Sequence, residues 1–522
     1  MVGATVSPIS VTVASVPAGE TPPARTLRAA WRDLGRELVS RPYRRAAAGA
    51  AVVALAAWGF AMANFTLAGD EWFSIFPEAT LDTDYALWAG RWVMPLVWAV
   101  TGNGGTAQFL TLGVALALLI LAGLVAASAW RFTRGWAAFA VAALFVTCPL
   151  FTDSLSFEQA HISSPLAMVV VAAAGWLVLR HEGARLLRIA VVAGAVLWSL
   201  ASYQPTALVF AVVVIGGEVR RAAAEGSGYW RVAWPRWLDT VGAVLAGVAG
   251  YALSLQVAWW ATGTDPSAGH DAYSLVGGYP ALGDLPRLAW RGLRTVGRFW
   301  FGDTALYPVA LKALGLGLIA GGAALAGWAA SSRGGASRWG RGATALWVAV
   351  LAAASAVVPF TVLFLRADPP SDGSNFTVVG LVVGLWAGLL LEETLRRGST
   401  RAFRFAAGAV AAVALALTLS GAFQVNKGFV GLALANQRDL ANANRMLSVM
   451  EQMPEFSSGE AIRIELVGRV AFRVAGSPFA TPVDGAPGAS VANCSGLACQ
   501  NRLVHMFELI GAGERDFVVR AV

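Results

Sequence analysis

Long apolar segments alternate with short polar ones along most of this chain. The apolar segments begin near residue 46 and recur as far as residue 423. A helix of about 20 mainly apolar residues is long enough to cross the hydrocarbon core of a bilayer. We therefore predict an all-α polytopic membrane protein with eleven spans, at residues 46–66, 107–130, 136–151, 163–180, 187–203, 205–219, 239–262, 305–330, 343–365, 376–395 and 404–423.

The composition excludes two other classes of protein. Of the 522 residues, 57% are hydrophobic and 13% are charged, whereas about a quarter of the residues in an ordinary soluble domain are charged. A soluble globular protein is therefore excluded. The net charge of +8 does not indicate a nucleic-acid partner, because the basic residues occur in short clusters between the apolar segments, as topology signals do.

The arginines predict the orientation of the spans. With a cytoplasmic N-terminus, the cytoplasmic segments contain most arginines of the connections, and the outer loops contain only Arg91, Arg287, Arg291, Arg294, Arg298 and Arg366. Cytoplasmic loops of membrane proteins carry an excess of Lys and Arg. The assignment keeps the spans 187–203 and 205–219 separate, although only Gln204 lies between them. An odd number of spans then places the C-terminal tail outside.

These predictions divide the chain into three regions. Residues 1–45 are a cytoplasmic tail with an interfacial helix, and residues 46–423 are the membrane domain, with outer loops at 67–106 and 263–304. Residues 424–522 are expected to form a small extracytoplasmic α/β domain, with a helical pattern at 436–453 and a strand-like run at 462–467. Cys494 and Cys499 lie in this region, where an oxidising compartment favours a disulfide and two free thiols are the alternative.

The first outer loop, 67–106, carries the most suggestive acids. Asp70, Glu71, Asp82 and Asp84 lie within fifteen residues, interleaved with aromatic side chains. A carboxylate pair there can act as a general base toward a sugar hydroxyl or can hold a divalent cation; ordinary solvated loop residues are the alternative. Asp70 lies about one helical turn beyond the first span, near headgroup level. The stretch 82–98 is expected to form an amphipathic helix in the interface.

A second outer segment, 285–301, has a basic amphipathic pattern. Its four arginines, Arg287, Arg291, Arg294 and Arg298, would lie within an arc of roughly 60° on a helix. The apolar residues Leu288, Leu293, Val296, Phe299 and Trp300 are expected on the opposite face. Guanidinium groups suit phosphate oxygens, so a polyprenyl phosphate or pyrophosphate is one expected partner of this face, and anionic lipid headgroups are the other.

Further polar side chains occur at the outer ends of spans. They are Glu158, His161, Tyr203, Gln204 and Arg366. Ionisable groups at membrane depth are candidates for a functional site, although a single histidine such as His161 is more often packed or capping than a ligand. The chain contains no P-loop, no His-Glu-x-x-His and no paired Cys-x-x-Cys spacing, which argues against ATP-driven transport and zinc hydrolysis.

The order of these motifs resembles the GT-C fold glycosyltransferases, and within them the serotype-converting glucosyltransferases of the Gtr type II family. The resemblance rests on Gly69-Asp70-Glu71-Trp72, Gly90-Arg91-Trp92, Phe157-Glu158-Gln159-Ala160, Ser202-Tyr203-Gln204-Pro205 and the polar segment that starts at Asn436. Members of this family often have two consecutive aspartates after the first span, where this chain has Asp70-Glu71. That difference leaves open which acid is the base.

The resemblance implies an inverting hexosyltransferase of the bacterial cytoplasmic (inner) membrane. It implies a polyprenyl-phosphate sugar, most simply a glucose-like hexose, as donor, and a cell-surface or lipid-linked glycan as acceptor on the outer side. Two alternatives stay open. An O-antigen ligase or polymerase would move whole glycans, and a flippase or transporter would predict internal repeats and broken helices.

The expected chemistry assigns a role to each candidate. Asp70 is expected to be the base that activates the acceptor hydroxyl, with Glu71 orienting it or binding Mg²⁺ or Mn²⁺. Arg91 is expected to stabilise the leaving phosphate, with Arg291 and Arg294 as second choices. Asp82 or Asp84 would orient sugar hydroxyls. We expect the remaining candidates, Trp92, Glu158, His161, Tyr203, Gln204 and Arg366, to line the substrate site.

Overall fold

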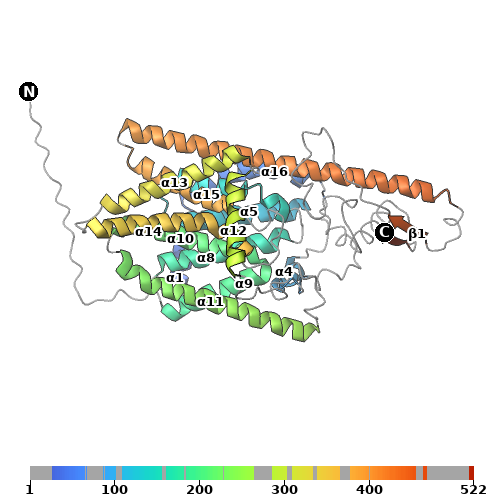
Figure 1. Ribbon diagram of the computed structural model, residues 1–522, viewed down its shortest axis with the longest axis horizontal. Coiled ribbons are helices and arrows are strands. Elements are labelled where there is room, and N and C mark those ends of the chain that lie inside the picture. The colour runs from blue at the N-terminus through green and yellow to red at the C-terminus, as the bar shows by residue number, and fades with distance from the viewer. Residues whose placement is uncertain are drawn as a thin grey trace, which may run out of the picture.

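The computed structural model describes the membrane region and two short strands of the tail. The described residues are 26–64, 66, 86–87, 89–101, 108–155, 160–181, 184–226, 229–263, 285–302, 308–332, 338–364, 377–398, 400–453, 462–466 and 517–521. Most of them are helical, and most helices run along one common direction (Figure 1).

Many of the helices are joined by short connections, and longer segments precede α4 (Val93–Thr101) and α12 (Leu285–Phe301). In order they are α1 (Leu27–Leu38), α2 (Arg41–Ala63), α4 (Val93–Thr101), α5 (Gln108–Ala129), α6 (Gly135–Val146), α7 (Phe151–Ser154), α8 (Ala160–Arg180), α9 (Arg185–Ser202), the 3-10 helix η2 (Gln204–Ala207), α10 (Leu208–Glu225), α11 (Tyr229–Thr262), α12 (Leu285–Phe301), α13 (Val309–Ser332), α14 (Arg338–Val357), the 3-10 helix η5 (Val358–Phe364), α15 (Val379–Arg396) and α16 (Arg401–Met450).

Every segment predicted to span the membrane contains a helix, and the all-α polytopic class is confirmed. Among the described residues, eight helices are long and apolar enough to cross a bilayer. The three other predicted spans correspond to α6, α10 and α15. α6 has only 12 residues, and α10 and α15 include several charged residues. The total of eleven spans therefore stays a prediction.

The shortest of these helices lies in the centre of the bundle. α6 packs against α2, α5 and α15, and its residues from Ala137 onward are almost all buried. Small side chains allow this close packing. A Cβ atom at Gly123 of α5 would lie 2.9 Å from the Cα atom of Ala142, and one at Gly384 of α15 would lie 3.0 Å from the Cα atom of Val141. A helix enclosed by protein on all sides does not need the length of a lipid-exposed span.

The separation of the spans 187–203 and 205–219 is confirmed. α9 ends at Ser202, η2 occupies Gln204–Ala207, and α10 begins at Leu208. Pro205 at the start of η2 lacks a backbone N–H and cannot continue the α9 hydrogen-bond ladder. The chain therefore reverses here, and the helix ends alternate along the sequence as the arginine pattern predicts.

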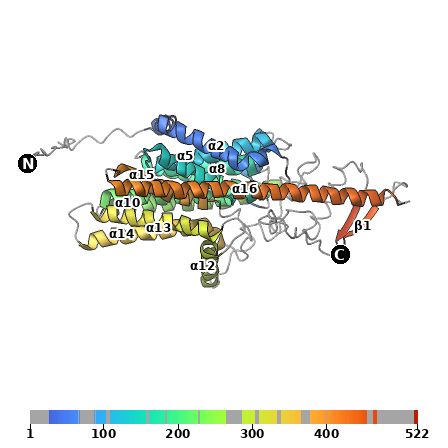
Figure 2. The same cartoon turned by 90° about the horizontal axis from the view of Figure 1, so that it is seen from above.

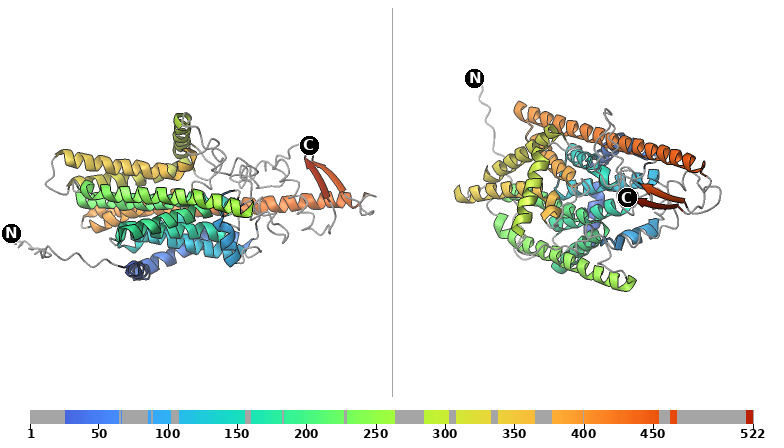
Figure 3. Two further views of the ribbon diagram at one scale, coloured as in Figure 1. Left: turned by 90° about the horizontal axis from the view of Figure 1, so that it is seen from below. Right: turned by 45° about the vertical axis from the view of Figure 1, so that its right-hand side comes forward.

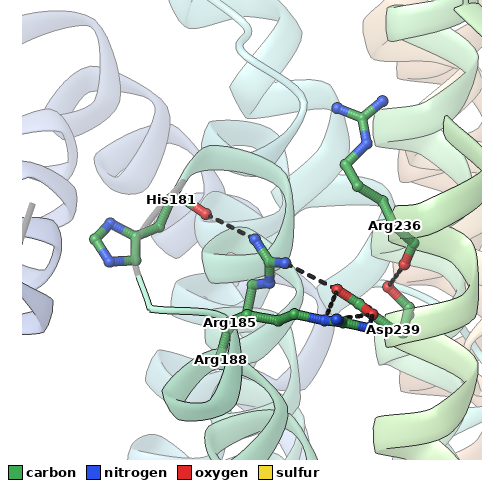
Figure 4. Close-up of polar contacts among 6 residues, drawn as sticks. His181, Arg185, Arg188, Arg236 and Asp239 are labelled. Carbon is green, nitrogen blue, oxygen red and sulfur yellow. Dashed lines mark hydrogen bonds and ion pairs between the residues drawn. The ribbon is translucent and has the colours of Figure 1, made fainter. Parts of the chain in front are cut away.

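Most arginines of the connections between spans lie at one end of the bundle, which we call the arginine-rich end. Two of its contacts join α9 to α11 through Asp239 (Figure 4): Arg185 Nη2 donates to Asp239 Oδ1 at 2.5 Å, and Arg188 Nη2 donates to Oδ2 at 3.3 Å. The amphipathic α1 packs at this end as well, with Arg180 of α8 paired to Glu37 at 2.8 Å. Residues 1–45 thus contain the predicted helix, and it contacts the bundle.

At the same end, a buried carboxylate binds the backbone just before the start of α6. Glu392 of α15 accepts hydrogen bonds from the backbone N–H groups of Thr133 and Arg134 at 3.2 and 3.1 Å. These N–H groups precede α6, so the carboxylate satisfies donors that a helix start leaves unpaired and interacts favourably with the helix dipole.

The last helix crosses the predicted domain boundary without a break, and the boundary itself stays a prediction. α16 continues without interruption through the boundary drawn at residue 424 and includes most of the helical pattern at 436–453. No proline occurs between Gln424 and Met450, and Pro454 follows shortly after the helix end. A helix of 50 residues is about 75 Å long, against a hydrocarbon core of about 30 Å. It therefore projects beyond the bundle (Figures 2 and 3).

The tail contributes two described strands. β1 (Ile462–Leu466) matches the strand-like run in the sequence, and it pairs in parallel with β2 (Phe517–Ala521), with Ile462 opposite Phe517. The sequence did not indicate the partner strand. Cys494 and Cys499 lie outside the described residues, so the disulfide stays a prediction, as does the α/β character of the whole tail.

Candidate functional site

The acidic loop is described at its two ends. Several sequence-predicted site residues lie outside the described residues, namely Asp70, Glu71, Asp82, Asp84, Glu158 and Arg366. The proposed carboxylate ligands of a cation are among them. The structure does describe the contacts that fix the chain on either side of these acids, at the bundle end opposite the arginine-rich end.

The first end of the loop is held by a pair of buried polar side chains. Thr66 lies three residues after α2 and four residues before Asp70. Its backbone N–H donates to Gln108 Oε1 at 3.1 Å, and Gln108 Nε2 donates to Thr66 Oγ1 at 3.2 Å. Both residues are buried. Because this pairing uses both ends of one amide group, it fixes where the chain leaves α2 relative to the start of α5.

The polar contacts continue from Gln108 to His161. Thr111 Oγ1 lies 3.0 Å from His161 Nδ1, and His161 Nε2 lies 2.9 Å from the carbonyl oxygen of Leu155. A carbonyl can only accept, so Nε2 carries the proton and Nδ1 accepts from the threonine. His161 is 1% exposed, and both ring nitrogens bond within the protein. This geometry fits the packing role that the sequence left open better than it fits substrate binding.

The second end of the loop is held by side chains from other helices. Three carbonyl groups just before Arg91 accept hydrogen bonds, which is unusual for a surface turn. The pairs are Leu87 O with Trp259 Nε1 at 3.0 Å, Ala89 O with Gln204 Nε2 at 2.8 Å and Gly90 O with the Tyr251 hydroxyl at 3.1 Å. Gln204 belongs to η2, and Tyr251 and Trp259 belong to α11. We call this segment, residues 86–92, the Arg91 turn.

Gly90 is required by the backbone of the Arg91 turn. Its φ is +71°, a conformation that costs other L-residues about 1–2 kcal/mol. An added Cβ would also overlap the Tyr251 hydroxyl. The glycine of the Gly90-Arg91-Trp92 motif thus lets the chain turn and lets α11 approach it closely.

We expect Gly90→Ala to displace the Arg91 turn and to lower the apparent Tm of the protein in detergent. Thermal unfolding measures the effect. Gly59→Ala is the matched control, because Gly59 lies in α2 with open space around it, where alanine favours the helix. Adding Tyr251→Phe to Gly90→Ala should restore part of the loss; equal behaviour of Gly59→Ala and Gly90→Ala would contradict this account.

Arg91 is held by an aromatic ring. Its guanidinium carbon lies 4.8 Å from the centroid of the Tyr203 ring, a cation–π contact that fixes the plane of the group. Its Nε is buried and has no hydrogen-bond partner in the described part of the chain. The structure therefore brings together Arg91, Tyr203 and Gln204, which the sequence predicted separately, and it leaves one guanidinium donor of Arg91 without a partner among the described residues.

Trp92 anchors the turn in the bundle. Its indole N–H donates to Ser254 Oγ at 3.2 Å, and its ring packs beside a small apolar cluster with Val93, Tyr251 and Trp259. The polar edge of this side chain is thus used within the protein. α4, which follows, replaces the C-terminal part of the amphipathic helix predicted at 82–98, and its Leu96 and Val100 are exposed.

The basic helix has the bounds predicted from its residue pattern. α12 covers Leu285–Phe301 and lies across the common direction of the other helices, beside the end of α13 (Figures 1 and 2). Leu288, Val296, Phe299 and Trp300 are buried as expected, but Leu293 is 53% exposed, which corrects its predicted place. Leu293 lies at the edge of the apolar face, beyond the contact with η5 and α13.

A buried lysine fixes the end of α12. Lys312 of α13 is 1% exposed. Its Nζ donates to the carbonyl oxygen of Gly302 at 2.7 Å and lies 4.8 Å from the centroid of the Phe299 ring. A cation at a helix C-terminus is favourable. Arg294 is exposed and Arg291 is partly buried. α12 rests on η5 and α13, whereas the Arg91 turn rests on η2 and α11, so the two basic features occupy different parts of the same bundle end.

Sequence reasoning missed the residues that support the Arg91 turn and the loop start. Thr66, Gln108, Tyr251, Ser254 and Trp259 carry no motif of their own. One signal was present: Tyr251, Ser254 and Trp259 fall close to one face of a long apolar helix, where polar groups need a partner.

Comparison with known proteins agrees with the motif pattern. Residues 59–281 match the model of a family described as Glucosyl transferase GtrII. The matched segment includes the acidic loop, the Arg91 turn, η2 and all of α11. No curated protein and no solved structure matches the chain. The match supports the resemblance carried by the motifs: residues 59–281 of this multi-pass membrane protein are similar to the Gtr type II glucosyltransferase family.

Proposed function

We propose that this protein is an inverting GT-C glycosyltransferase that moves a single glucose-like hexose from a polyprenyl-phosphate donor to a cell-surface or lipid-linked glycan. The observation that carries the proposal is the anchoring of the acidic loop. Thr66–Gln108 holds one end, and the Arg91 turn holds the other end against η2 and α11. A catalytic group needs such support, because small displacements of reacting groups reduce rates strongly.

The donor chemistry requires a base and a cation on opposite sides of the reacting carbon. The acceptor hydroxyl loses a proton as it attacks, and the lipid phosphate leaves as an anion. Asp70 takes the proton in this scheme, and Glu71 orients it or helps to hold a divalent cation. The polyprenyl phosphate already contains the energy of the sugar–phosphate bond, so no nucleotide is needed.

Arg91 is the described residue best placed to receive the leaving phosphate. Its guanidinium plane is fixed by Tyr203, and its Nε donor is unused within the described residues. A preorganised donor of this kind stabilises charge that develops in the transition state. Arg291 and Arg294 of α12 are second choices, since they lie on a separate part of the same end. Asp82 or Asp84, Glu158 and Arg366 are proposed to bind the sugar or the acceptor.

The proposed location follows from the two ends of the bundle. The arginine-rich end faces the cytoplasm of a bacterial inner membrane, because positive residues favour that side. The acidic loop, α12 and the tail with β1 and β2 then lie outside. In a background with Cys148, Cys494 and Cys499 replaced by serine, an external cysteine label on a loop variant such as Ala68→Cys should react in intact cells, and a label that reacts only after lysis would contradict this orientation.

The donor can be tested with the purified full-length protein. We expect transfer of glucose from a synthetic polyprenyl-phosphate glucose to an extracted cell-surface or lipid-linked glycan, and no transfer from UDP-glucose under the same conditions. Product analysis should show the addition of one hexose with inverted anomeric configuration. Transfer from the nucleotide sugar without lipid, or transfer of a whole glycan from a pyrophosphate lipid, would exclude the proposed donor.

A further inference from the structure

A cavity of about 220 Å³ lies at the arginine-rich end, away from the acidic loop. It is enclosed by α10, α13 and α15. Its polar lining consists of Arg220, Glu393 and Arg396, and its apolar lining includes Ala326, Ala329 and Leu389. One water occupies about 30 Å³ of liquid, so the space is large enough for several waters or for a compact charged headgroup.

Arg220, one of the residues that line the cavity, has an unused donor. Its Nη1 is buried and has no hydrogen-bond partner among the described residues. Its guanidinium carbon lies 5.2 Å from the centroid of the Phe132 ring, which holds the group against the bundle. A buried charge without a bonded counter-charge is costly. An anion in the cavity would remove this cost.

The one carboxylate in the lining is already paired. Glu393 Oε2 accepts from Arg396 Nη2 at 2.7 Å and lies 3.5 Å from Arg397 Nε. Arg396 and Arg397 therefore share the carboxylate of Glu393. Arg220 forms no ion pair with it within 4 Å in the described part of the chain, so the cavity keeps a positive character at Arg220.

The shape of the cavity favours a lipid over a free ion. Its rim includes the exposed Arg396 and Ala224, while Leu389 and Ala326 at its inner side are buried. A positive rim over an apolar inner wall suits a molecule with a phosphate at one end and hydrocarbon at the other. Basic pockets between membrane helices bind anionic headgroups in this way.

We propose that this cavity binds the phosphate of one anionic phospholipid from the membrane leaflet at the arginine-rich end. Arg220 donates to a phosphate oxygen, and Arg396 lies at the opening of the cavity. The alanine and leucine side chains of α13 and α15 contact the glycerol and the first methylene groups of the lipid. This site is separate from the transfer site and does not depend on the transfer chemistry.

Native mass spectrometry of the full-length protein in detergent tests the site, with phosphatidylglycerol, phosphatidylcholine and inorganic phosphate as probes. We expect one tightly retained phosphatidylglycerol per chain, with phosphatidylcholine bound more weakly. Arg220→Gln should weaken phosphatidylglycerol binding by about tenfold or more, as loss of a charge-assisted bond to phosphate predicts. Arg401→Gln is the matched control, because Arg401 is exposed at the start of α16 at the same end.

A second variant keeps the arginine and removes the space. The larger side chain of Ala326→Leu projects into the cavity and should also reduce phosphatidylglycerol binding. Thermal unfolding should show that this variant is still folded. It provides the test if Arg220→Gln does not fold. Equal phosphatidylglycerol binding in the wild type and both cavity variants would overturn the proposal. Stabilisation by inorganic phosphate equal to that by phosphatidylglycerol would overturn the lipid assignment, as would equal binding of phosphatidylcholine.

Discussion

Asp70→Asn should reduce sugar transfer from polyprenyl-phosphate glucose by a factor of about 10²–10⁴, the range that positioned general bases contribute. Asparagine keeps the size and most hydrogen bonds of aspartate but cannot take the hydroxyl proton. Substrate binding should change little, so the loss is expected in kcat. Initial rates at saturating donor and acceptor, with membrane-extracted full-length protein, measure it.

Glu71→Gln provides the comparison for this pair. If Glu71 only orients Asp70, its loss should be smaller and independent of added Mg²⁺ or Mn²⁺. If the pair holds a cation, both variants should require more metal for half-maximal activity than the wild type. Unchanged turnover in Asp70→Asn would remove its assignment as the base, and a loss confined to Glu71→Gln would assign the base to Glu71.

Arg91→Gln should lower transfer by about 10²–10³-fold, comparable with removal of one preorganised transition-state donor, which is about 2.7–4 kcal/mol. The fixed guanidinium would no longer receive the charge that develops on the lipid phosphate. Arg91→Lys should recover only part of the rate, because lysine keeps the charge but loses the planar fork and the stacking on Tyr203. Steady-state kcat and KM for the lipid donor measure both variants.

Arg44→Gln is the matched control for Arg91, since Arg44 is an exposed arginine at the opposite end of the bundle. It should transfer sugar at the wild-type rate. Thermal unfolding of both variants separates chemistry from folding, because Arg91 also belongs to an ordered turn. Equal rates for Arg44→Gln and Arg91→Gln would show that the leaving phosphate is stabilised elsewhere, with α12 as the next place to test.

The apolar helices, the basic helix α12 and the break between α9 and α10 could be predicted because they depend on local patterns in the sequence. The apolar runs predicted the positions of the helices in every expected span. The spacing of four arginines predicted α12 with its observed bounds. Pro205 separated α9 from α10. α16 continues through the predicted boundary at 424, because a change from apolar to polar composition does not end a helix. Without a proline or a left-handed glycine, the α16 hydrogen-bond ladder continues into water.

The supports of the site could not be predicted, because they join residues far apart in the chain. Gln204 bonds to Ala89 across 115 positions, and Tyr251 bonds to Gly90 across 161 positions. No local period contains such a pair; it arises only when α11 and η2 pack beside the turn. The unpaired Arg220 donor is of the same kind, since its surroundings come from α13 and α15.

The sequence by itself determined the class of this protein, the positions of its apolar helices, the basic face of α12 and the family to which residues 59–281 are related. These properties depend on composition and short-range spacing, which every helix carries with it. Only the tertiary structure decided which polar groups hold the acidic loop, that His161 is enclosed and that Arg91 stacks on Tyr203. Those contacts depend on how the helices pack, and packing is a property of the whole bundle.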